Sequence, residues 1–402
     1  MRLTSWALLS FSFVQLGCAG TPPSGEGSAP ASAHRVVQPD SFPSGRPYSF
    51  GVQTGNFLYL SGQLGRHIET GAQPEGIGAQ TRQAMENIGE VLRTAAMDYA
   101  NLVKCHVYLG TMDDYGGMNQ AYGSFFTERV PARTTVEAEG LPGGAGVEIA
   151  CIAYRDLAGI SVVRPAAGTL PAPLGPYSAA VWAGDTLYLS GMGGQSPEGK
   201  PLPESLGEQI AQTLTNIRTT LGAAGLGFSD VVSSSVYVTR PEESGEVTGL
   251  YASSFTSPPP PWGLLFLPRL PGPIKAEITF VASRQGAERR MIAPAGGSEL
   301  ETRGLLVGDA LYTRTESAPD SGPDFEEQFR GTLRRLESTL AEAGLGWRNV
   351  VHVNIYLAEL GDAVRMDEIF RETFPREPPA RTTIQVMAGN GPRVQAALVA
   401  RR

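Results

Sequence analysis

The chain has few of the residues that hold disulfide-rich or metal-dependent folds together. Its 402 residues include 3 cysteines and 4 histidines. Three cysteines are too few for a framework of disulfide bonds. The histidines show none of the spacings that metal ligands use; they are His34, His67, His106 and His352. We therefore expect no metal site and no other cofactor.

Positive charge is also scarce. The chain has 32 Lys and Arg residues against 40 Asp and Glu residues, which gives a net charge of −8 at pH 7. A protein that binds nucleic acid usually carries a basic surface, so we expect no nucleic-acid partner. Hydrophobic residues make up 41% and charged residues 18% of the chain, which is typical of a globular protein rather than a disordered one. A chain of this length has room for two or three domains.

The apolar run at the N-terminus, Leu3–Leu16, is too short to span a bilayer well. It follows the positive residue Arg2 and ends at Gly17 and Cys18, which resembles the signal of a bacterial lipoprotein. We expect Cys18 to be lipidated and to become the mature N-terminus, although Gln15 stands where such signals usually carry leucine. Secretion without a lipid is the alternative.

The predicted signal thus covers residues 1–18. Residues 19–35 are rich in Gly, Pro, Ser and Ala, which favours a flexible linker. We expect an exported protein, held at a membrane (periplasmic or at the cell surface) only through its lipid, or otherwise secreted. The remaining cysteines, Cys105 and Cys151, lie in strand-like apolar runs, which favours two buried thiols. A disulfide between them is the alternative in an exported protein.

Several motifs occur more than once in the chain. FLYLSGQ at residues 57–63 returns as TLYLSGM at 186–192 and, weakly, as ALYTRTE at 310–316. The pentapeptide PARTT occurs at Pro131–Thr135 and again at Pro379–Thr383. Each unit also closes with a strand, a turn and a second strand. Repetition on this scale indicates copies of one structural unit.

The first helix of each unit carries the same apolar stripe. In the stretches 80–95, 209–224 and 328–343, apolar residues stand three and four positions apart, which is one buried face of a helix. A strand follows each stretch, and a second helical stretch follows around 120–128 and around 368–374. These patterns predict an α+β chain of three modules: module 1 at 36–157, module 2 at 165–285 and module 3 at 290–402.

With these segments in place, each module resembles the reactive intermediate deaminase (RidA/YjgF) family. The resemblance rests on YLSGQ, QTRQAMENI, VKCHVYL, PARTT and LPGGAGVEIACIA of module 1, which matches nearly end to end. Modules 2 and 3 are diverged copies. Family members are similar in fold to chorismate mutase and form homotrimers with clefts between subunits. The resemblance therefore implies a pseudo-trimer within one chain, that is, a monomer with internal pseudo-threefold symmetry.

In this family the arginine of PARTT holds the carboxylate of a small 2-imino acid or enamine, which is hydrolysed to a 2-keto acid and ammonia. A guanidinium suits this task because its planar N–H donors pair with both carboxylate oxygens. The resemblance implies that Arg133 is the clamp of module 1 and that Glu148 orients the attacking water. The further binding residues that it implies in module 1 are Tyr48, Ser61, Asn119 and Thr135.

Modules 2 and 3 keep different parts of this set. The residues kept in module 2 are Tyr177, Ser190 and Glu277, while Trp262 replaces the arginine and Thr248 the asparagine. The residues kept in module 3 are Arg381, Thr382 and Thr383. Its replacements are Arg314 for the serine, Asp367 for the asparagine and Gln395 for the glutamate, and no tyrosine lies near Glu301.

This pattern is informative if each cleft takes its arginine from one module and its tyrosine, serine and glutamate from a neighbour. Two pairings are then possible. In the first, Arg133 meets the polar set of module 2, Arg381 meets that of module 1, and the third cleft has lost both halves. In the second, one complete cleft and two half-clefts remain. The first pairing is preferred because it requires the loss of only one cleft.

The leading hypothesis is a hydrolytic deaminase of small 2-imino acids and enamines that needs no metal, with a small carboxylate-bearing substrate. The alternative is a non-catalytic module whose surviving clefts bind a small carboxylate ligand or a protein partner. Two substituted modules and the predicted export favour the alternative. Ribonuclease activity has been attached to some relatives, but the acidic net charge counts against it.

Overall fold

The computed structural model describes residues 34–402 except for 198–199, 256–257, 285, 294–301 and 390. The predicted signal peptide, Cys18 and most of the predicted linker lie outside the described residues. All helices and strands given below belong to the compact unit Ser32–Arg402. None of the described helices is both long enough and apolar enough to cross a bilayer.

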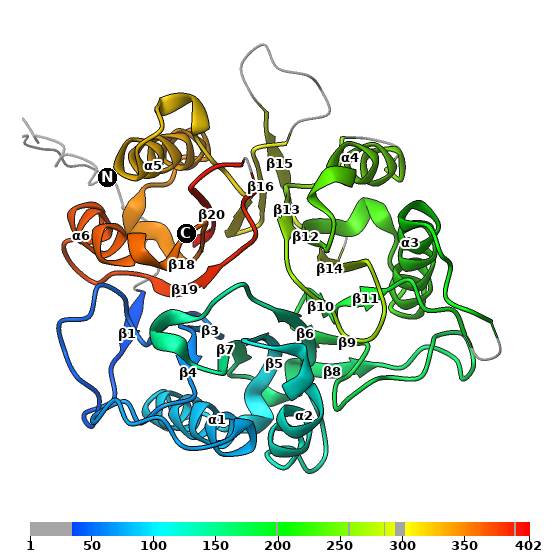
Figure 1. Cartoon of the computed structure of the whole chain (residues 1–402), viewed down its shortest axis with the longest axis horizontal. Helices are drawn as coiled ribbons and strands as arrows, with labels where there is room; N and C mark the ends of the chain where they lie inside the picture. Colours follow the sequence, from blue (N-terminus) through cyan, green and yellow to red (C-terminus); the bar gives the residue numbers. More distant parts are fainter. Residues whose placement is uncertain (1–33, 198–199, 256–257, 285, 294–301, 390) are drawn as a thin grey trace, which may run out of the picture. The chain divides into compact units, whose positions relative to one another are not determined.

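Module 1 is a seven-stranded sheet with two helices packed side by side on one face (Figure 1). The strand order is β1-β2-β3-β7-β5-β6, and β4 pairs with β7. Strands β5 and β6 are parallel, as their connection through a helix requires. The elements are β1 (Arg35–Val37), β2 (Gly51–Thr54), β3 (Phe57–Leu60), β4 (Gln63–Leu64), α1 (Ile77–Thr94), β5 (Leu102–Leu109), α2 (Tyr115–Gly123), β6 (Ala132–Glu137) and β7 (Val147–Tyr154).

Modules 2 and 3 repeat this arrangement, with the orders β13-β12-β14-β10-β9-β8 and β15-β16-β17-β20-β18-β19. Module 2 contains β8 (Ile160–Val163), β9 (Ala180–Ala183), β10 (Thr186–Leu189), β11 (Met192–Gly193), α3 (Leu206–Ala223), β12 (Val231–Val238), α4 (Ser244–Ser253), β13 (Trp262–Phe266) and β14 (Ala276–Ser283). Module 3 contains β15 (Arg289–Ile292), β16 (Gly304–Val307), β17 (Ala310–Thr313), α5 (Phe325–Glu342), β18 (Val350–Leu357), α6 (Ala363–Thr373), β19 (Ala380–Gln385) and β20 (Val394–Arg401). The predicted α+β architecture of three tandem modules is confirmed.

The apolar stripe of each long helix is buried against its own sheet, as its spacing predicts. The stripe residues are Met85, Ile88 and Leu92 on α1, Leu214, Ile217 and Leu221 on α3, and Leu333, Leu336 and Leu340 on α5. All three helices begin three residues before the predicted stretch, and a polar side chain caps two of them. Ser205 Oγ accepts the N–H of Glu208 at 3.2 Å, and Asp324 Oδ1 accepts the N–H of Glu326 at 2.8 Å.

The shorter helices differ more from the predicted stretches. Helices α2 and α6 begin five residues earlier, at Tyr115 and Ala363, and module 2 contains α4, which no apolar pattern predicted. A short 3-10 turn at Met112–Asp114 leads directly into α2. Two glycines, Gly116 and Gly117, then occupy the first turn of α2, and glycine is a poor helix former. These glycines lower the helix propensity of the first turn, so the sequence pattern does not indicate where α2 begins.

The three modules pack against one another through residues at equivalent positions. Tyr108, Tyr237 and Tyr356, one from each module, lie in the same buried cluster. A second buried cluster joins Tyr59 of module 1, Tyr188 of module 2 and Val351 of module 3. Each module therefore buries surface against the others within one chain, which brings segments from neighbouring modules together at their junctions.

The structure corrects the prediction of two buried thiols. Cys105 on β5 and Cys151 on β7 stand directly opposite each other in antiparallel register, with their Cα atoms 4.1 Å apart. Their sulfur atoms are bonded at 2.04 Å. Both side chains belong to the core on the helix side of the sheet. The burial was predicted correctly, but the strand register that makes the two residues neighbours cannot be seen in their sequence positions.

Candidate functional site

Two junctions between modules are built from the same hydrogen bonds. Where modules 1 and 2 meet, the N–H of Arg133 donates to Ser190 Oγ at 2.8 Å, and the N–H of Gly191 donates to the Arg133 carbonyl at 3.0 Å. Where modules 3 and 1 meet, the N–H of Arg381 donates to Ser61 Oγ at 2.8 Å. Each serine also donates its own hydroxyl hydrogen to a backbone carbonyl at 2.6 Å. The two predicted serines thus hold in place the strands that carry the arginines.

These junctions bring the predicted residues together as in the first of the two pairings. Cleft A joins Arg133 of module 1 with Tyr177, Ser190 and Glu277 of module 2. Cleft B joins Arg381 of module 3 with Tyr48, Ser61 and Glu148 of module 1. Both clefts need two modules, so neither set of residues is complete within one repeat.

In cleft A the guanidinium of Arg133 is surrounded by aromatic rings and neutral donors and acceptors. Its central carbon lies 5.0 Å from the ring centre of Tyr122 and 5.5 Å from that of Tyr177. Nη2 donates to Asn119 Oδ1 at 2.7 Å and to Tyr115 Oη at 3.3 Å. Arg133 is buried, and these contacts use only part of its five N–H donors. The cation is therefore held in position without an anionic partner among these contacts.

Glu277 is the buried acid of cleft A. Burial raises the pKa of its carboxyl group to about 8, and the nearby cations Lys104 and Arg133 and the backbone N–H of Thr135 oppose that rise. The hydroxyl of Thr135 is buried and has no hydrogen-bond partner among the described residues. Near neutral pH Glu277 can thus be either protonated or ionised. A group that takes up a proton and returns it needs both states.

Lys104 lies behind this acid and was not predicted from the sequence. Its ammonium is fully buried and donates to Leu189 O at 2.6 Å, Thr134 Oγ1 at 2.7 Å and Thr279 Oγ1 at 2.9 Å. Burial lowers the pKa of Lys104 to about 7, which Glu277 opposes. The corresponding residue of module 3 is His352, whose pKa is lowered to about 4 by burial. A buried amine therefore accompanies the acid of cleft A.

Two glycines that the sequence analysis did not single out make room for the acids. A Cβ atom on Gly191 would overlap Glu277 Oε1, and a Cβ atom on Gly62 would overlap Glu148 Oε1. The signal was present in the repeat, since glycine follows serine in both YLSG motifs, whereas module 3 has Thr315 there and no glutamate at Gln395. Glycine and glutamate are thus kept or lost together.

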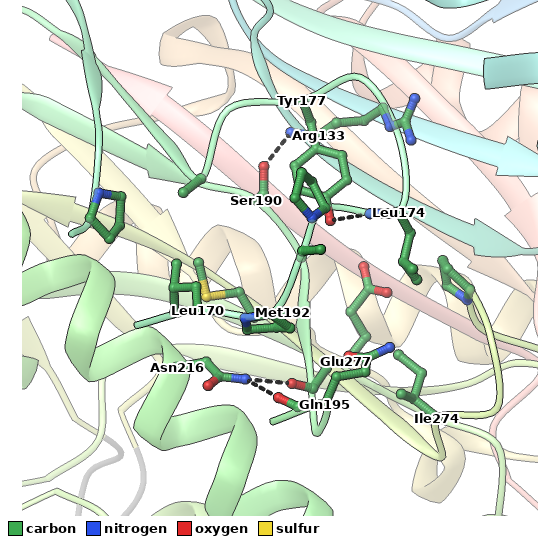
Figure 2. Close-up of a pocket in the computed structure, with 18 of the residues that line it drawn as sticks. Arg133, Leu170, Leu174, Tyr177, Ser190, Met192, Gln195, Asn216, Ile274 and Glu277 are labelled. Carbon is green, nitrogen blue, oxygen red and sulfur yellow. Dashed lines mark hydrogen bonds between the residues drawn. The ribbon is translucent and has the colours of Figure 1, made fainter. Parts of the chain in front are cut away.

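A cavity of about 460 Å³ opens in cleft A. Arg133, Thr135, Tyr177, Ser190 and Glu277 all contribute to its walls. Figure 2 shows the carboxyl group of Glu277 between Ile274 and Leu174, with Tyr177 and Ser190 on the side of Arg133. The predicted residues therefore face one space that is large enough for a small organic acid.

Cleft B has the same framework but a different partner for its arginine. The guanidinium of Arg381 lies 5.1 Å from the ring centre of Tyr48 and 5.0 Å from that of Phe370. Its Nη2 atom is 2.7 Å from Oδ1 of Asp367, the residue that replaces Asn119 of module 1. Burial also raises the pKa of Glu148 to about 8. The hydroxyl of Thr383, like that of Thr135, has no hydrogen-bond partner among the described residues.

The third junction, cleft C between modules 2 and 3, keeps the backbone contact but not the polar side chains. The N–H of Thr315 donates to the carbonyl of Trp262 at 3.2 Å. The indole of Trp262 stacks on Tyr251 with ring centres 4.5 Å apart, in the place of an arginine over an aromatic ring. Arg314 forms an ion pair with buried Glu316 at 2.7 Å. Cleft C therefore has an aromatic stack and an ion pair among its described residues where clefts A and B have the arginine, serine and glutamate.

Comparison with known proteins agrees with this description. The family Endoribonuclease L-PSP matches residues 39–155, 168–284 and 311–396, one match in each module. A mouse protein named 2-iminobutanoate/2-iminopropanoate deaminase is 40% identical over 110 residues, which is 27% of this chain and 82% of the mouse protein. A RutC family protein of Pyrococcus horikoshii is 40% identical over 111 residues, or 27% of this chain and 88% of that protein.

Among solved structures, RidA from the Antarctic bacterium Psychrobacter sp. PAMC 21119 is 36% identical, with 30% of this chain and 98% of that chain covered and a TM-score of 0.29. The relatives named above are proteins of about one module in length, whereas here the family pattern occurs three times in succession. The chain resembles RutC family proteins and 2-iminobutanoate/2-iminopropanoate deaminases. It belongs to the Endoribonuclease L-PSP family and carries three tandem modules of that family.

Proposed function

We propose that this protein is a hydrolytic deaminase that converts 2-imino acids and their enamine tautomers into 2-keto acids and ammonia, chiefly in cleft A. One observation carries the proposal: a buried arginine that has no ion pair among the described residues and a buried acid of raised pKa, from two different modules, line the same cavity. The similarity of single modules to 2-iminobutanoate/2-iminopropanoate deaminases supports it.

Arg133 binds the substrate carboxylate in this proposal. The carboxylate brings the negative charge that the desolvated guanidinium lacks, and two parallel N–H···O contacts fix the plane of the substrate. Asn119 and Tyr115 keep the guanidinium in place through one nitrogen and leave other N–H groups for the substrate. The free hydroxyl of Thr135 supplies a further contact. The carbon of the C=N bond is thereby presented toward Glu277.

Glu277 then handles the protons of hydrolysis. Its carboxylate accepts a proton from water as the water oxygen bonds to the imine carbon and the C=N bond becomes a single bond. The resulting carboxylic acid returns that proton to the nitrogen, which gives a carbinolamine. The carboxylate of Glu277 then takes the proton of the carbinolamine hydroxyl and passes it to the nitrogen as the C=O bond forms and the C–N bond breaks, which releases ammonia and the 2-keto acid. The raised pKa of Glu277, about 8, suits a group that must perform both transfers near neutral pH.

A coupled assay tests the proposal. An amino-acid oxidase generates the imine from its amino acid in the presence of semicarbazide, which traps the imine as an absorbing adduct. Added protein is expected to lower the yield of adduct because it removes the imine by hydrolysis. The matched variant carries Glu277→Gln and Glu148→Gln, which keep the shape of both acids but cannot take up a proton, and it is expected to leave the adduct yield unchanged.

The opposite result would favour a binding role. If the wild-type protein leaves the adduct yield unchanged but binds 2-keto acids in calorimetry, with loss of binding in Arg133→Ala, then cleft A holds a small carboxylate without turning it over. The ion pair of Arg381 with Asp367 and the replacement of the clamp arginine by Trp262 at cleft C are the features that favour this second reading.

We also propose that the protein is exported and held at a membrane through Cys18. The disulfide between Cys105 and Cys151 supports export, since such bonds persist in oxidising compartments. The wild-type protein is expected to enter the detergent-rich phase on phase separation, and Cys18→Ala to remain in the aqueous phase. Recovery of the wild type in the aqueous phase would contradict lipidation.

A further inference from the structure

We propose that cleft A prefers 2-imino acids whose side chain is large and apolar, branched or aromatic, with four or more carbons. Imines whose side chain has only one or two carbons, such as 2-iminopropanoate and 2-iminobutanoate, are poorer substrates in this proposal. The segment between β8 and β9 forms one wall of the side-chain pocket. This inference rests on the proposed function, because it names the substrate class of the same site.

This segment, residues 165–174 and called the strap below, lines the cavity along most of its length. The strap residues that line it are Pro165, Ala166, Ala167, Gly168, Leu170, Pro171, Ala172, Pro173 and Leu174. The strap contains no charged residue, and Thr169 is its only polar one. It therefore contributes an apolar surface to a site whose other end holds Arg133 and Glu277.

A turn within the strap and contacts at its C-terminal end hold the strap in place. The hydroxyl of Thr169 donates to Ala166 O at 2.6 Å, which closes a turn. The N–H of Leu174 donates to Tyr177 Oη at 3.2 Å, and Asn119 Nδ2 donates to Leu174 O at 3.4 Å. Three prolines further restrict its backbone. The wall is thus attached directly to the residues that surround Arg133.

The wall contributed by module 2 is also apolar. Met192 and Ile274 line the cavity, and in Figure 2 Met192 and Leu170 lie together on the side away from the guanidinium of Arg133. At the equivalent positions of module 1, which contributes its acid to cleft B, the chain has Gln63 and Ala145. A polar residue and a small one there leave cleft B without this apolar lining.

The volume of the cavity exceeds what a small imine needs. At about 30 Å³ for each water in the liquid, the 460 Å³ cavity corresponds to roughly fifteen waters. An imine of three carbons would leave much of that space to water against apolar walls. A larger side chain displaces this water, and each buried methylene is worth about a fourfold gain in affinity.

The test compares imines from alanine and leucine in the Arg381→Ala background, which removes the contribution of cleft B. We expect kcat/KM for the leucine-derived imine to exceed that for the alanine-derived imine by at least about tenfold. Calorimetric titration with 4-methyl-2-oxopentanoate and pyruvate supplies a readout that needs no turnover, and the same order of affinity is expected.

Variants locate the preference in the pocket. Met192→Gln together with Ile274→Ala installs the residues of module 1 and is expected to bring the leucine-to-alanine ratio to within about threefold of unity. Leu174→Ser changes a strap residue that is 48% exposed, so the fold does not depend on it, and should lower the ratio in the same direction. The control is Leu157→Ala, which is 53% exposed and lies outside the cavity.

The outcomes separate this inference from the proposed function. Hydrolysis of both imines at similar rates would overturn the substrate preference and leave the deaminase proposal standing. Absence of hydrolysis with tighter binding of 4-methyl-2-oxopentanoate than of pyruvate would overturn the deaminase proposal and support the apolar pocket. Binding of neither acid would overturn both.

Discussion

Clefts A and B share one backbone framework and differ in what stands beside the arginine. In cleft A, Nη2 of Arg133 is 2.7 Å from the neutral oxygen of Asn119; in cleft B, Nη2 of Arg381 is 2.7 Å from the carboxylate of Asp367. Under the proposed function, a substrate carboxylate would meet a cation that has no ion pair among the described residues in cleft A, but would compete with a resident anion in cleft B. One amide-to-acid replacement is thus enough to make two similar sites unequal.

The surroundings of the two acids differ as well, although less than those of the two arginines. Burial raises the pKa of both Glu277 and Glu148 to about 8. Behind Glu277 lies the buried amine of Lys104, whereas His352 at the equivalent position of module 3 has its pKa lowered to about 4 and is neutral at pH 7. The repeat therefore preserves the acid in both clefts and varies the charges around it.

The largest expected effect comes from removing each arginine in turn. Arg133→Ala is expected to lower kcat/KM for imine hydrolysis by about 30- to 1000-fold, because it leaves the substrate carboxylate unpaired in the dominant cleft. Arg381→Ala should change it by less than about twofold. Circular dichroism checks folding. If the two variants each halve the activity, clefts A and B contribute equally and Asp367 has no effect on the competence of cleft B.

The next effect tests the space that glycine leaves for the acid. Gly191→Ala is expected to lower activity about a hundredfold, since its methyl group would displace Glu277 and remove general acid–base catalysis. The matched control is Gly222→Ala on α3, where a Cβ atom meets nothing within 4 Å. The control should retain full activity and gain stability, because alanine is the better helix former. Full activity in Gly191→Ala would show that Glu277 is not needed where it lies.

Exchanging Asn119 and Asp367, the partners of the two arginines, should make the activity of each cleft more like that of the other. Asn119→Asp is expected to lower kcat/KM about tenfold by placing an anion beside Arg133. Asp367→Asn, measured in the Arg133→Ala background, should raise the residual activity of cleft B by a similar factor. Calorimetry with a 2-keto acid gives the matching changes in affinity. An increase of activity in Asn119→Asp would show that an anion beside the arginine does not weaken the cleft.

The smallest effect concerns stability and pH. Glu148 has its pKa raised to about 8 in the folded protein, whereas an ordinary glutamate ionises near pH 4.5. The contribution of the protonated acid to stability is thus complete below pH 4.5 and is lost as the pH rises toward 8. Glu148→Gln is expected to have a higher Tm than the wild type at pH 8, by roughly a few degrees, and a similar Tm at pH 4. Glu75→Gln, at an exposed position, is the control and should shift neither Tm.

Much of the fold could be predicted because local sequence patterns, such as the spacing of apolar residues, indicate it. Met85, Ile88 and Leu92 define a helix face by their spacing alone, and the copies of that stripe define three modules. The motif PARTT points to Arg133 and Arg381 in the same way, since a resemblance can be followed residue by residue along the chain. Such signals lie within short segments and do not depend on what those segments touch.

What only the tertiary structure decided are the contacts between segments far apart in the chain. The pairing of Arg133 with Ser190, the disulfide between Cys105 and Cys151, and the strap over the cavity all depend on strand register or on which modules meet. The sequence showed aspartate in place of Asn119, but only the folded chain places that carboxylate against Arg381. Sequence periodicity determines which face of an element is buried; the neighbour that buries it, and the charge it brings, follow from packing across the whole chain.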